Sequence, residues 1–370
     1  MKTKILVTAL AAGMVAAPSA QAAVEISGQV NVAALFGGAA DDLTVVDNNT
    51  TGTRFRFKAN TKFGNGFAVG TRFEIQAQFA QSNDPDQIGE NGGGSDVNPG
   101  SVGELVNPDS LGPNGEVLFT SLTDNIDNGG NTPVREVRYA DVWISGPFGR
   151  VGIGRGDGAA NGTAEAVGLL NFLGGNESHL LFNGLGADFN DIDGLSRQNR
   201  VRYDSPSWDG FRFAISLDNE DEQEVGLFYD KKGSFGKVRV RAGFTTGEGD
   251  ASTADFSIAY KFPFGLGLNY STGEADAVSG VTTSENDWFL VSYDITKKFL
   301  ISAGYGEETE RSASTGAQEG GENDLIILSA VWKPVKGAEI YLNYGDWTNN
   351  VVINDADDDN TFALGGRFKF

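Results

Sequence analysis

A run of spaced aspartates near the C-terminus is the clearest candidate for metal chemistry in this sequence. Asp355, Asp357 and Asp359 have the spacing of a calcium-binding loop, and carboxylate oxygens are ligands that Ca²⁺ prefers. Asn360 and Gly366 stand where such a loop needs a glycine and a bidentate glutamate, which excludes a regular EF-hand. An irregular structural Ca²⁺ site stays open beside the simpler interpretation, a solvated acidic loop.

Catalysis and cofactor binding find little support in the residue types. His179 is the only histidine, and we interpret it as a polar loop residue rather than a general base. The absence of cysteine excludes disulfides and Cys/His zinc sites. Gly152 and Gly154 begin a glycine-rich run, but Asp157 stands where a dinucleotide-binding motif needs its third glycine, and no amphipathic helix follows. We therefore expect no bound cofactor and no enzymatic activity.

The basic residues follow a pattern that points to a charged surface. Residues 54–58 read Arg-Phe-Arg-Phe-Lys, the two-residue period of a strand with an aromatic face and a basic face. An arginine that faces lipid at mid-membrane costs about 2 to 4 kcal/mol, so in a membrane barrel these side chains would face water. The facing of Arg138 is ambiguous, because aromatic and acidic side chains alternate with it. The expected basic wall cluster is Arg54, Arg56, Lys58, Arg72, Arg138, Arg200 and Arg202.

The elements that must position these side chains are strands of about ten residues. Apolar and polar residues alternate along most of the chain, and 51 glycines disfavour long helices. Seven short turns alternate with eight longer connections rich in Asp, Asn, Gly and Ser, which predicts sixteen strands with both termini on the short-turn side. Most of the short turns carry Phe or Trp, as an aromatic girdle at a membrane interface would. This layout is typical of an all-β, antiparallel transmembrane barrel.

A soluble β-sandwich or β-helix is the alternative fold for the same alternation. Connections at residues 82–132 and 157–195 span 51 and 39 residues, which is anomalous in a compact soluble domain. In a barrel, such loops can fold inward or over the mouth. We therefore favour the barrel.

The first 22 residues predict a secretory signal peptide. Lys2 and Lys4 precede an apolar run that ends in Ala20-Gln21-Ala22. Cleavage would leave one domain, residues 23–370, and would lower the formal net charge from −22 to −24, because two lysines and no acid are removed. Such an acidic chain repels phosphate backbones, so nucleic acid is not an expected partner.

Four segments carry a family resemblance. They are residues 24–30, residues 145–155 (Ser-Gly-Pro-Phe-Gly-Arg-Val-Gly-Ile-Gly-Arg), residues 199–211 with their Arg-Tyr-Asp-Ser-Pro block, and the terminal Phe370. Together they resemble the general porins of Gram-negative bacteria, which are trimeric sixteen-stranded channels. The resemblance implies a location in the outer membrane among lipid and lipopolysaccharide, and it implies that Phe370 is the signal read by the barrel-assembly machinery.

The same resemblance implies that the third long loop folds into the lumen, with acidic residues facing the basic wall cluster. Here that loop runs from Asp157 to Leu195, and its candidate acids are Asp157, Glu165, Glu177 and Asp188. Residues 168–175 are the nearest equivalent of the loop tip, although they depart from the sequence usual in such porins. Opposite charges across a narrow lumen would sort solutes by charge and dipole.

The predicted function is passive diffusion of ions and small hydrophilic solutes, with cation preference at the mouth from the acidic loops. The basic wall cluster acts against that preference. The alternatives are an adhesin-like surface or extracellular β protein, which would show no channel activity, and an outer-membrane enzyme, which would show turnover.

Overall fold

The computed structural model describes residues 23–37, 40–48, 52–64, 66–78, 134–170, 194, 197–219, 221–247, 252–276, 282–311, 318–348 and 359–370. One antiparallel sheet contains all the strands of this part. They are β1 (Ala23–Gly37), β2 (Ala40–Asp47), β3 (Arg54–Lys62), β4 (Ala68–Gln78), β5 (Val134–Gly146), β6 (Gly149–Asp157), β7 (Arg197–Asp204), β8 (Phe211–Asp218), β9 (Gln223–Gly233), β10 (Gly236–Thr246), β11 (Ser252–Lys261), β12 (Leu266–Asp276), β13 (Thr282–Thr296), β14 (Phe299–Arg311), β15 (Gln318–Trp332), β16 (Ala338–Thr348) and β17 (Asp359–Lys369).

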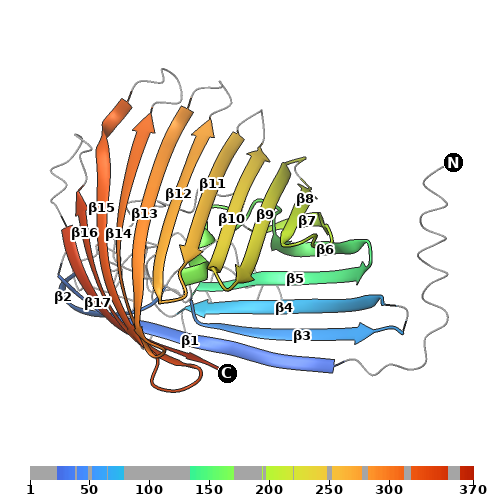
Figure 1. Cartoon of the computed structure of the whole chain (residues 1–370), viewed down its shortest axis with the longest axis horizontal. Helices are drawn as coiled ribbons and strands as arrows, with labels where there is room; N and C mark the ends of the chain where they lie inside the picture. The colour runs from blue at the N-terminus through green and yellow to red at the C-terminus, as the bar shows by residue number, and fades with distance from the viewer. Residues whose placement is uncertain are drawn as a thin grey trace, which may run out of the picture.

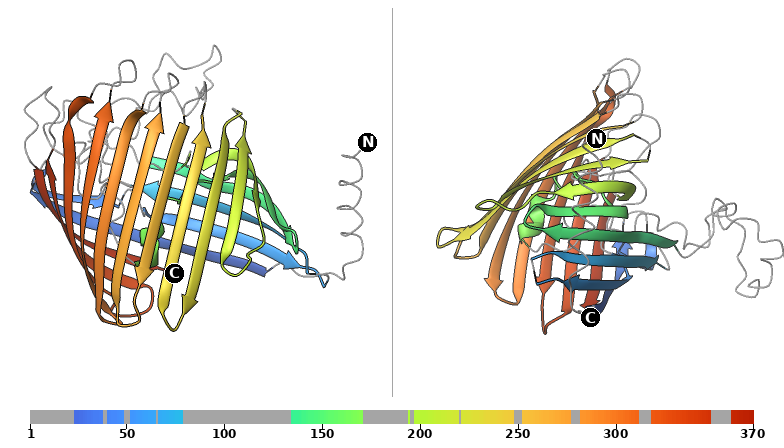
Figure 2. Two further views of the ribbon diagram at one scale, coloured as in Figure 1. Left: turned by 45° about the horizontal axis from the view of Figure 1, so that its top comes forward. Right: turned by 90° about the vertical axis from the view of Figure 1, so that its right-hand side faces the viewer.

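The sheet closes on itself, because β1 pairs with β17 on one side and with β2 and β3 on the other. Figure 1 shows β9 to β17 as one curved wall, with β1, β3, β4 and β5 crossing at a steep angle to it. The further views show the same sheet curving round an interior (Figure 2). The predicted all-β antiparallel barrel is confirmed.

Strands β2 and β3 together occupy one strand position in the barrel, because both pair with β1. Val32 of β1 pairs with Asp47 of β2, whereas Gln29 pairs with Arg54 of β3, so the return strand is interrupted between Asp47 and Arg54. Thr53 bridges the interruption, because its hydroxyl donates to Asp47 Oδ1 at 2.6 Å and accepts from the backbone N–H of Asn31. The seventeen labelled strands therefore make the sixteen-stranded barrel that the alternation predicts.

The outer face is apolar through the middle of the strands and becomes polar toward the long-loop end. On β14, the outward side chains run from Ile301 through Ala303 and Tyr305 to Glu307 and Thr309. The Tyr305 hydroxyl donates hydrogen bonds to carboxylates at this boundary. Tyr270 of β12 and Tyr344 of β16 are bonded in the same way, to Asp287 at 2.5 Å and to Asp346 at 3.2 Å. Outward tyrosines thus mark the edge of the lipid-facing belt, where an aromatic ring meets lipid and its hydroxyl meets water.

At the short-turn end, exposed aromatic residues flank the connections. Trp208, Phe235 and Phe264 are all exposed, and Phe67 packs against Phe148 with ring centroids 5.9 Å apart. This placement agrees with the aromatic girdle that the turn sequences predict. None of the helices in the described ranges is long and apolar enough to cross a membrane.

The inner face of β13 to β16 is more apolar than the alternation predicts. Trp288, Leu290, Leu325, Ile327 and Tyr341 point inward and are buried. They form one cluster with Val167 and Leu170 of the short 3-10 helix η4 (Ala166–Leu170), which lies inside the barrel. Part of the apolar surface of these strands therefore faces the lumen, where it holds a segment of the third loop.

Candidate functional site

A buried carboxylate on β4 gathers three arginines on the inner wall. Glu74 is fully buried, and its two oxygens bind Arg54 Nη1 at 3.7 Å, Arg138 Nε at 3.1 Å and Arg56 Nε. Arg138 also donates to Gln76 Oε1 at 2.7 Å. Three guanidinium groups around one carboxylate leave this part of the wall positive.

A second buried carboxylate, Asp141 on β5, repeats the arrangement nearer the short-turn end. Its Oδ2 lies 3.3 Å from Arg72 Nη2, 3.3 Å from Arg200 Nη2 and 3.8 Å from Arg150 Nη2. Arg72 also stacks on Tyr139, with its guanidinium carbon 3.4 Å from the ring centroid. Planar guanidinium groups bind carboxylates and aromatic faces with little loss of freedom, which fixes the arginines in an ordered row.

A β-bulge explains how Arg138 joins this row. Glu74 pairs with Tyr139, but the next residue, Ile75, pairs with Val137, so Arg138 is the extra residue on β5. A bulge places two consecutive side chains on one face, and both Arg138 and Tyr139 are turned inward and buried. The ambiguity of this strand in the sequence has this cause, because strict alternation cannot put both residues inside.

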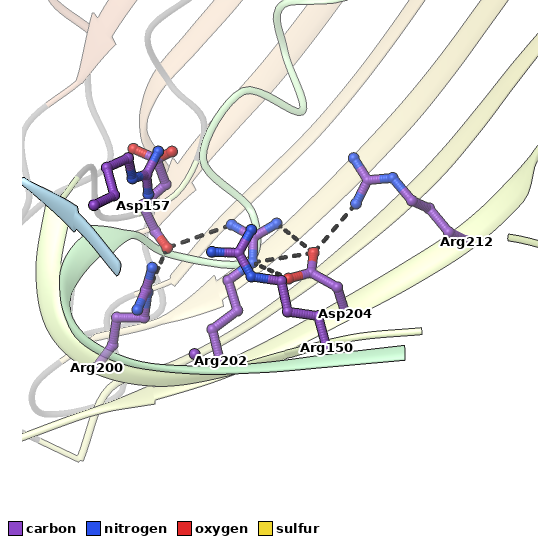
Figure 3. A pocket seen from close by; sticks show the side chains of 8 residues that line it. Arg150, Asp157, Arg200, Arg202, Asp204 and Arg212 are labelled. Carbon is purple, nitrogen blue, oxygen red and sulfur yellow. Dashed lines mark hydrogen bonds and ion pairs between the residues drawn. The ribbon is translucent and has the colours of Figure 1, made fainter. Parts of the chain in front are cut away.

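Five arginines surround a hollow of about 360 Å³ on β4, β6, β7 and β8, together with Asp157, Asp204 and Gly152. They are Arg72, Arg150, Arg200, Arg202 and Arg212. Arg202 Nη2 binds Asp204 Oδ1 at 2.8 Å, and Arg212 Nη1 reaches the same oxygen at 3.3 Å from the other side (Figure 3). The hollow extends from the short-turn end, where Arg150, Asp204 and Arg212 stand within two residues of strand ends, to Asp157 at the opposite end of β6.

The segment that follows β6 is held against the inner wall by hydrogen bonds. Ala159 N donates to Ser216 Oγ at 2.7 Å, and Ala160 N donates to Glu224 Oε2 at 3.2 Å. Farther on, Thr163 Oγ1 donates to Asp255 Oδ2 at 2.7 Å. Additional contacts are Arg202 with the carbonyls of Asp157 and Gly158, Arg241 with Gly162 O, Ser257 with Thr163 O and Ala166 N, and Ser271 with Ala164 O.

Glycines in the wall strands make room for this segment. A Cβ at Gly226 of β9 would collide with the carbonyl oxygen of Ala159, and one at Gly243 of β10 would collide with Thr163 Oγ1 and Asp255. A Cβ at Gly267 of β12 would stand 2.5 Å from Leu170 Cδ2. The wall therefore has a groove, lined by Gly226, Gly243 and Gly267, that fits residues 158–170.

The remaining predicted site residues fall in several places. Lys58 of β3 pairs in register with Arg72 and shares a smaller hollow with Arg72 and Arg150. Asp157 is the last residue of β6 rather than a loop residue, and its Oδ1 accepts a hydrogen bond from Tyr139 at 2.6 Å. Glu165 lies in residues 158–170, hereafter the docked segment, close enough to Arg241 for an electrostatic interaction.

The C-terminal residue closes the barrel seam. Phe370 exchanges two backbone hydrogen bonds with Gly28, and its exposed ring lies 6.3 Å from that of Phe55 on the outer face. Among the possible calcium ligands, Asp359 begins β17 and pairs with Trp347. The other predicted residues, Glu177, Asp188, Asp355 and Asp357, lie outside the described residues. Within the described ranges, no three acidic or histidine side chains are grouped closely enough to hold a metal ion.

Comparison with known protein families identifies the family of the chain. The model of the Gram-negative porin family matches residues 7–370. The chain belongs to this family. It is thus an outer-membrane porin, a diffusion channel without enzymatic activity. No curated protein sequence matches it significantly.

Solved porin structures share the fold of this porin at low sequence identity. The trimer form of OmpT from Vibrio cholerae is 15% identical with a TM-score of 0.57, over 94% of this chain and 99% of that one. An anion-selective porin from Comamonas acidovorans is 15% identical with a TM-score of 0.58, over 95% and 100%. OmpF of Salmonella typhi, in complex with daunomycin, is 12% identical with a TM-score of 0.59, over 94% and 97%.

Sequence reasoning missed the residues that organise the wall. Glu74 and Asp141 were visible as polar residues in amphipathic strands, but their role depends on cross-strand neighbours that periodicity does not identify. Arg150 and Arg212 were missed because each stands at the start of a strand, next to a turn. Strand register is the signal that could have found them, since Arg150 pairs directly with Asp204.

Proposed function

We propose that this porin is a passive channel for ions and small hydrophilic solutes and that it prefers cations. The observation that carries the channel is the contrast between an apolar outer face and an inner wall with ordered, partly exposed arginines. Charged groups along the wall would attract or repel solutes as they cross, without a chemical step.

The cation preference rests on the acidic excess of the chain. The formal net charge is −22, the long connections are rich in Asp, and the inward carboxylate Glu308 stands near the long-loop end of β14. A negative mouth concentrates cations before they enter. Recording in a salt gradient should give a reversal potential of the cation-selective sign. A clear anion-selective sign would show that the arginine wall, not the mouth, sets selectivity.

We further infer a homotrimer set in lipid and lipopolysaccharide, with Phe370 recognised by the barrel-assembly machinery. The trimer form of the Vibrio cholerae relative supports the oligomeric state. Cleavage after Ala22 is proposed from the signal-like first residues, and N-terminal sequencing of protein from the outer membrane should begin at Ala23.

A planar-bilayer measurement on protein extracted from outer membranes tests the channel directly. Conductance that closes in three equal steps is expected from a trimer of pores. Purified, heat-modifiable protein that gives no conductance would refute the channel and favour the adhesin-like alternative.

A further inference from the structure

We propose that the arginine-lined hollow on β4, β6, β7 and β8 is a binding subsite for small dianionic oxyanions, such as inorganic phosphate or a dicarboxylate. This inference rests on the proposed channel and adds to it a site where one class of solute binds transiently during passage. In barrels of this kind the short turns face the periplasm, so Arg150 and Arg212 would line the periplasmic part of the subsite.

The charge of the hollow supports the proposal. Its lining holds five arginines and two aspartates, and even when Asp141 behind it is included, the positive charges exceed the negative ones by two. A single dianion would neutralise that excess. Guanidinium groups present paired N–H donors that match the oxygens of phosphate and carboxylate, whereas a halide cannot use that geometry.

The contacts of the individual arginines show which of them can receive a solute. Arg150 reaches only 3.8 Å from Asp141 and keeps 41% of its side chain exposed, with its guanidinium over the ring of Trp143. Arg212 lies over the ring of Phe228 and is one-third exposed. Aromatic support holds both guanidinium groups in place and leaves donors toward the hollow.

Asp204 is the internal competitor for these donors. Its side chain lies between Arg202 and Arg212 and already accepts from both (Figure 3). An entering oxyanion would share these arginines with Asp204, which would keep its binding weak enough for release. Weak binding is what a transit site needs, because a solute that binds tightly does not leave.

The test is single-channel conductance in potassium chloride with inorganic phosphate added at mildly alkaline pH, where phosphate is a dianion. Phosphate should lower the chloride-carried current with a saturable dependence on concentration. Arg150→Gln and Arg212→Gln should each raise the half-saturating concentration about tenfold, the loss of one charge-assisted contact. Repeating the titration with succinate distinguishes a site for both oxyanions from one restricted to phosphate.

The control and the opposite variant make the outcome decisive. Arg367→Gln removes an inward arginine from β17, where it binds Glu339, and should leave the titration unchanged. Asp204→Asn should lower the half-saturating concentration, which a merely structural role for Asp204 would not do. A current that falls linearly with phosphate, or equal behaviour of Arg150→Gln and Arg367→Gln, would overturn the subsite. Complete absence of conductance would instead refute the proposed channel.

Discussion

Replacing Gly226 with alanine should detach the docked segment from the wall without unfolding the barrel. The new Cβ would lie well under 3.0 Å from the carbonyl oxygen of Ala159, closer than real Cβ atoms approach. Because that oxygen belongs to the backbone, rotation of a side chain cannot relieve the collision. The segment would have to withdraw by about 1 Å, as in other overpacked sites.

The magnitude follows from the two hydrogen bonds beside the collision. Ala159 N–Ser216 Oγ, at 2.7 Å, joins neutral groups, and Ala160 N–Glu224 Oε2, at 3.2 Å, ends on a carboxylate. A bond of the first kind contributes about 0.5 to 1.5 kcal/mol and one of the second about 1.5 to 3 kcal/mol. Loss of both would therefore destabilise docking by about 2 to 4 kcal/mol.

Hydrogen exchange measures this effect locally. The amides of Ala159 and Ala160 should exchange about 30-fold faster or more, since each 1.4 kcal/mol changes the opening equilibrium tenfold. The strand pairing of β9 with β8 and β10 should keep its protection. Gly366→Ala is the matched control, because its Cβ would lie 3.8 Å from the nearest atom, Glu339 O. Unchanged exchange at Ala159 in a folded Gly226→Ala protein would refute the groove.

Three further predictions concern the outer face, the wall and the C-terminus. Leu328→Arg, in the middle of the outer belt of β15, should lower the free energy of unfolding in lipid by about 2 to 4 kcal/mol. Thr309→Arg, near the edge of the belt, should lower it by only about 0 to 1 kcal/mol. Denaturant titration in vesicles measures both values, and equal costs would contradict the assigned belt. Glu74→Gln removes the negative charge that three arginines share, so the reversal potential should shift toward anion selectivity; no shift would show that these arginines lie outside the ion path. Phe370→Ala should reduce heat-modifiable protein in outer membranes while the purified chain still refolds in detergent; normal assembly would exclude Phe370 as the signal.

The barrel was predictable because its two faces meet different solvents. Alternation of arginine with phenylalanine, as in residues 54–58, has one low-energy arrangement in a membrane, with the basic side chains toward water. The alternation of short and long connections then fixed the strand number. Neither inference needs any knowledge of which strands touch, and both survive the interruption between β2 and β3.

The site was less predictable because it depends on local departures from that regularity. The bulge at Arg138 brings two neighbouring residues inside, and it is visible only as a shift in the pairing of β4 with β5. The same limit applies to Glu74, whose parity shows that it faces inward but not that three arginines converge on it.

The docked segment shows how a wall and a loop must be understood together. Gly243 looks like any glycine in a strand, where glycine normally weakens the sheet. Its function becomes clear only beside Thr163, eighty positions earlier, whose hydroxyl occupies the space of the missing side chain. The abundant glycine that disfavours helices in the sequence thus includes residues that shape the lumen. At these positions the absence of a side chain leaves room for the docked segment to approach the wall.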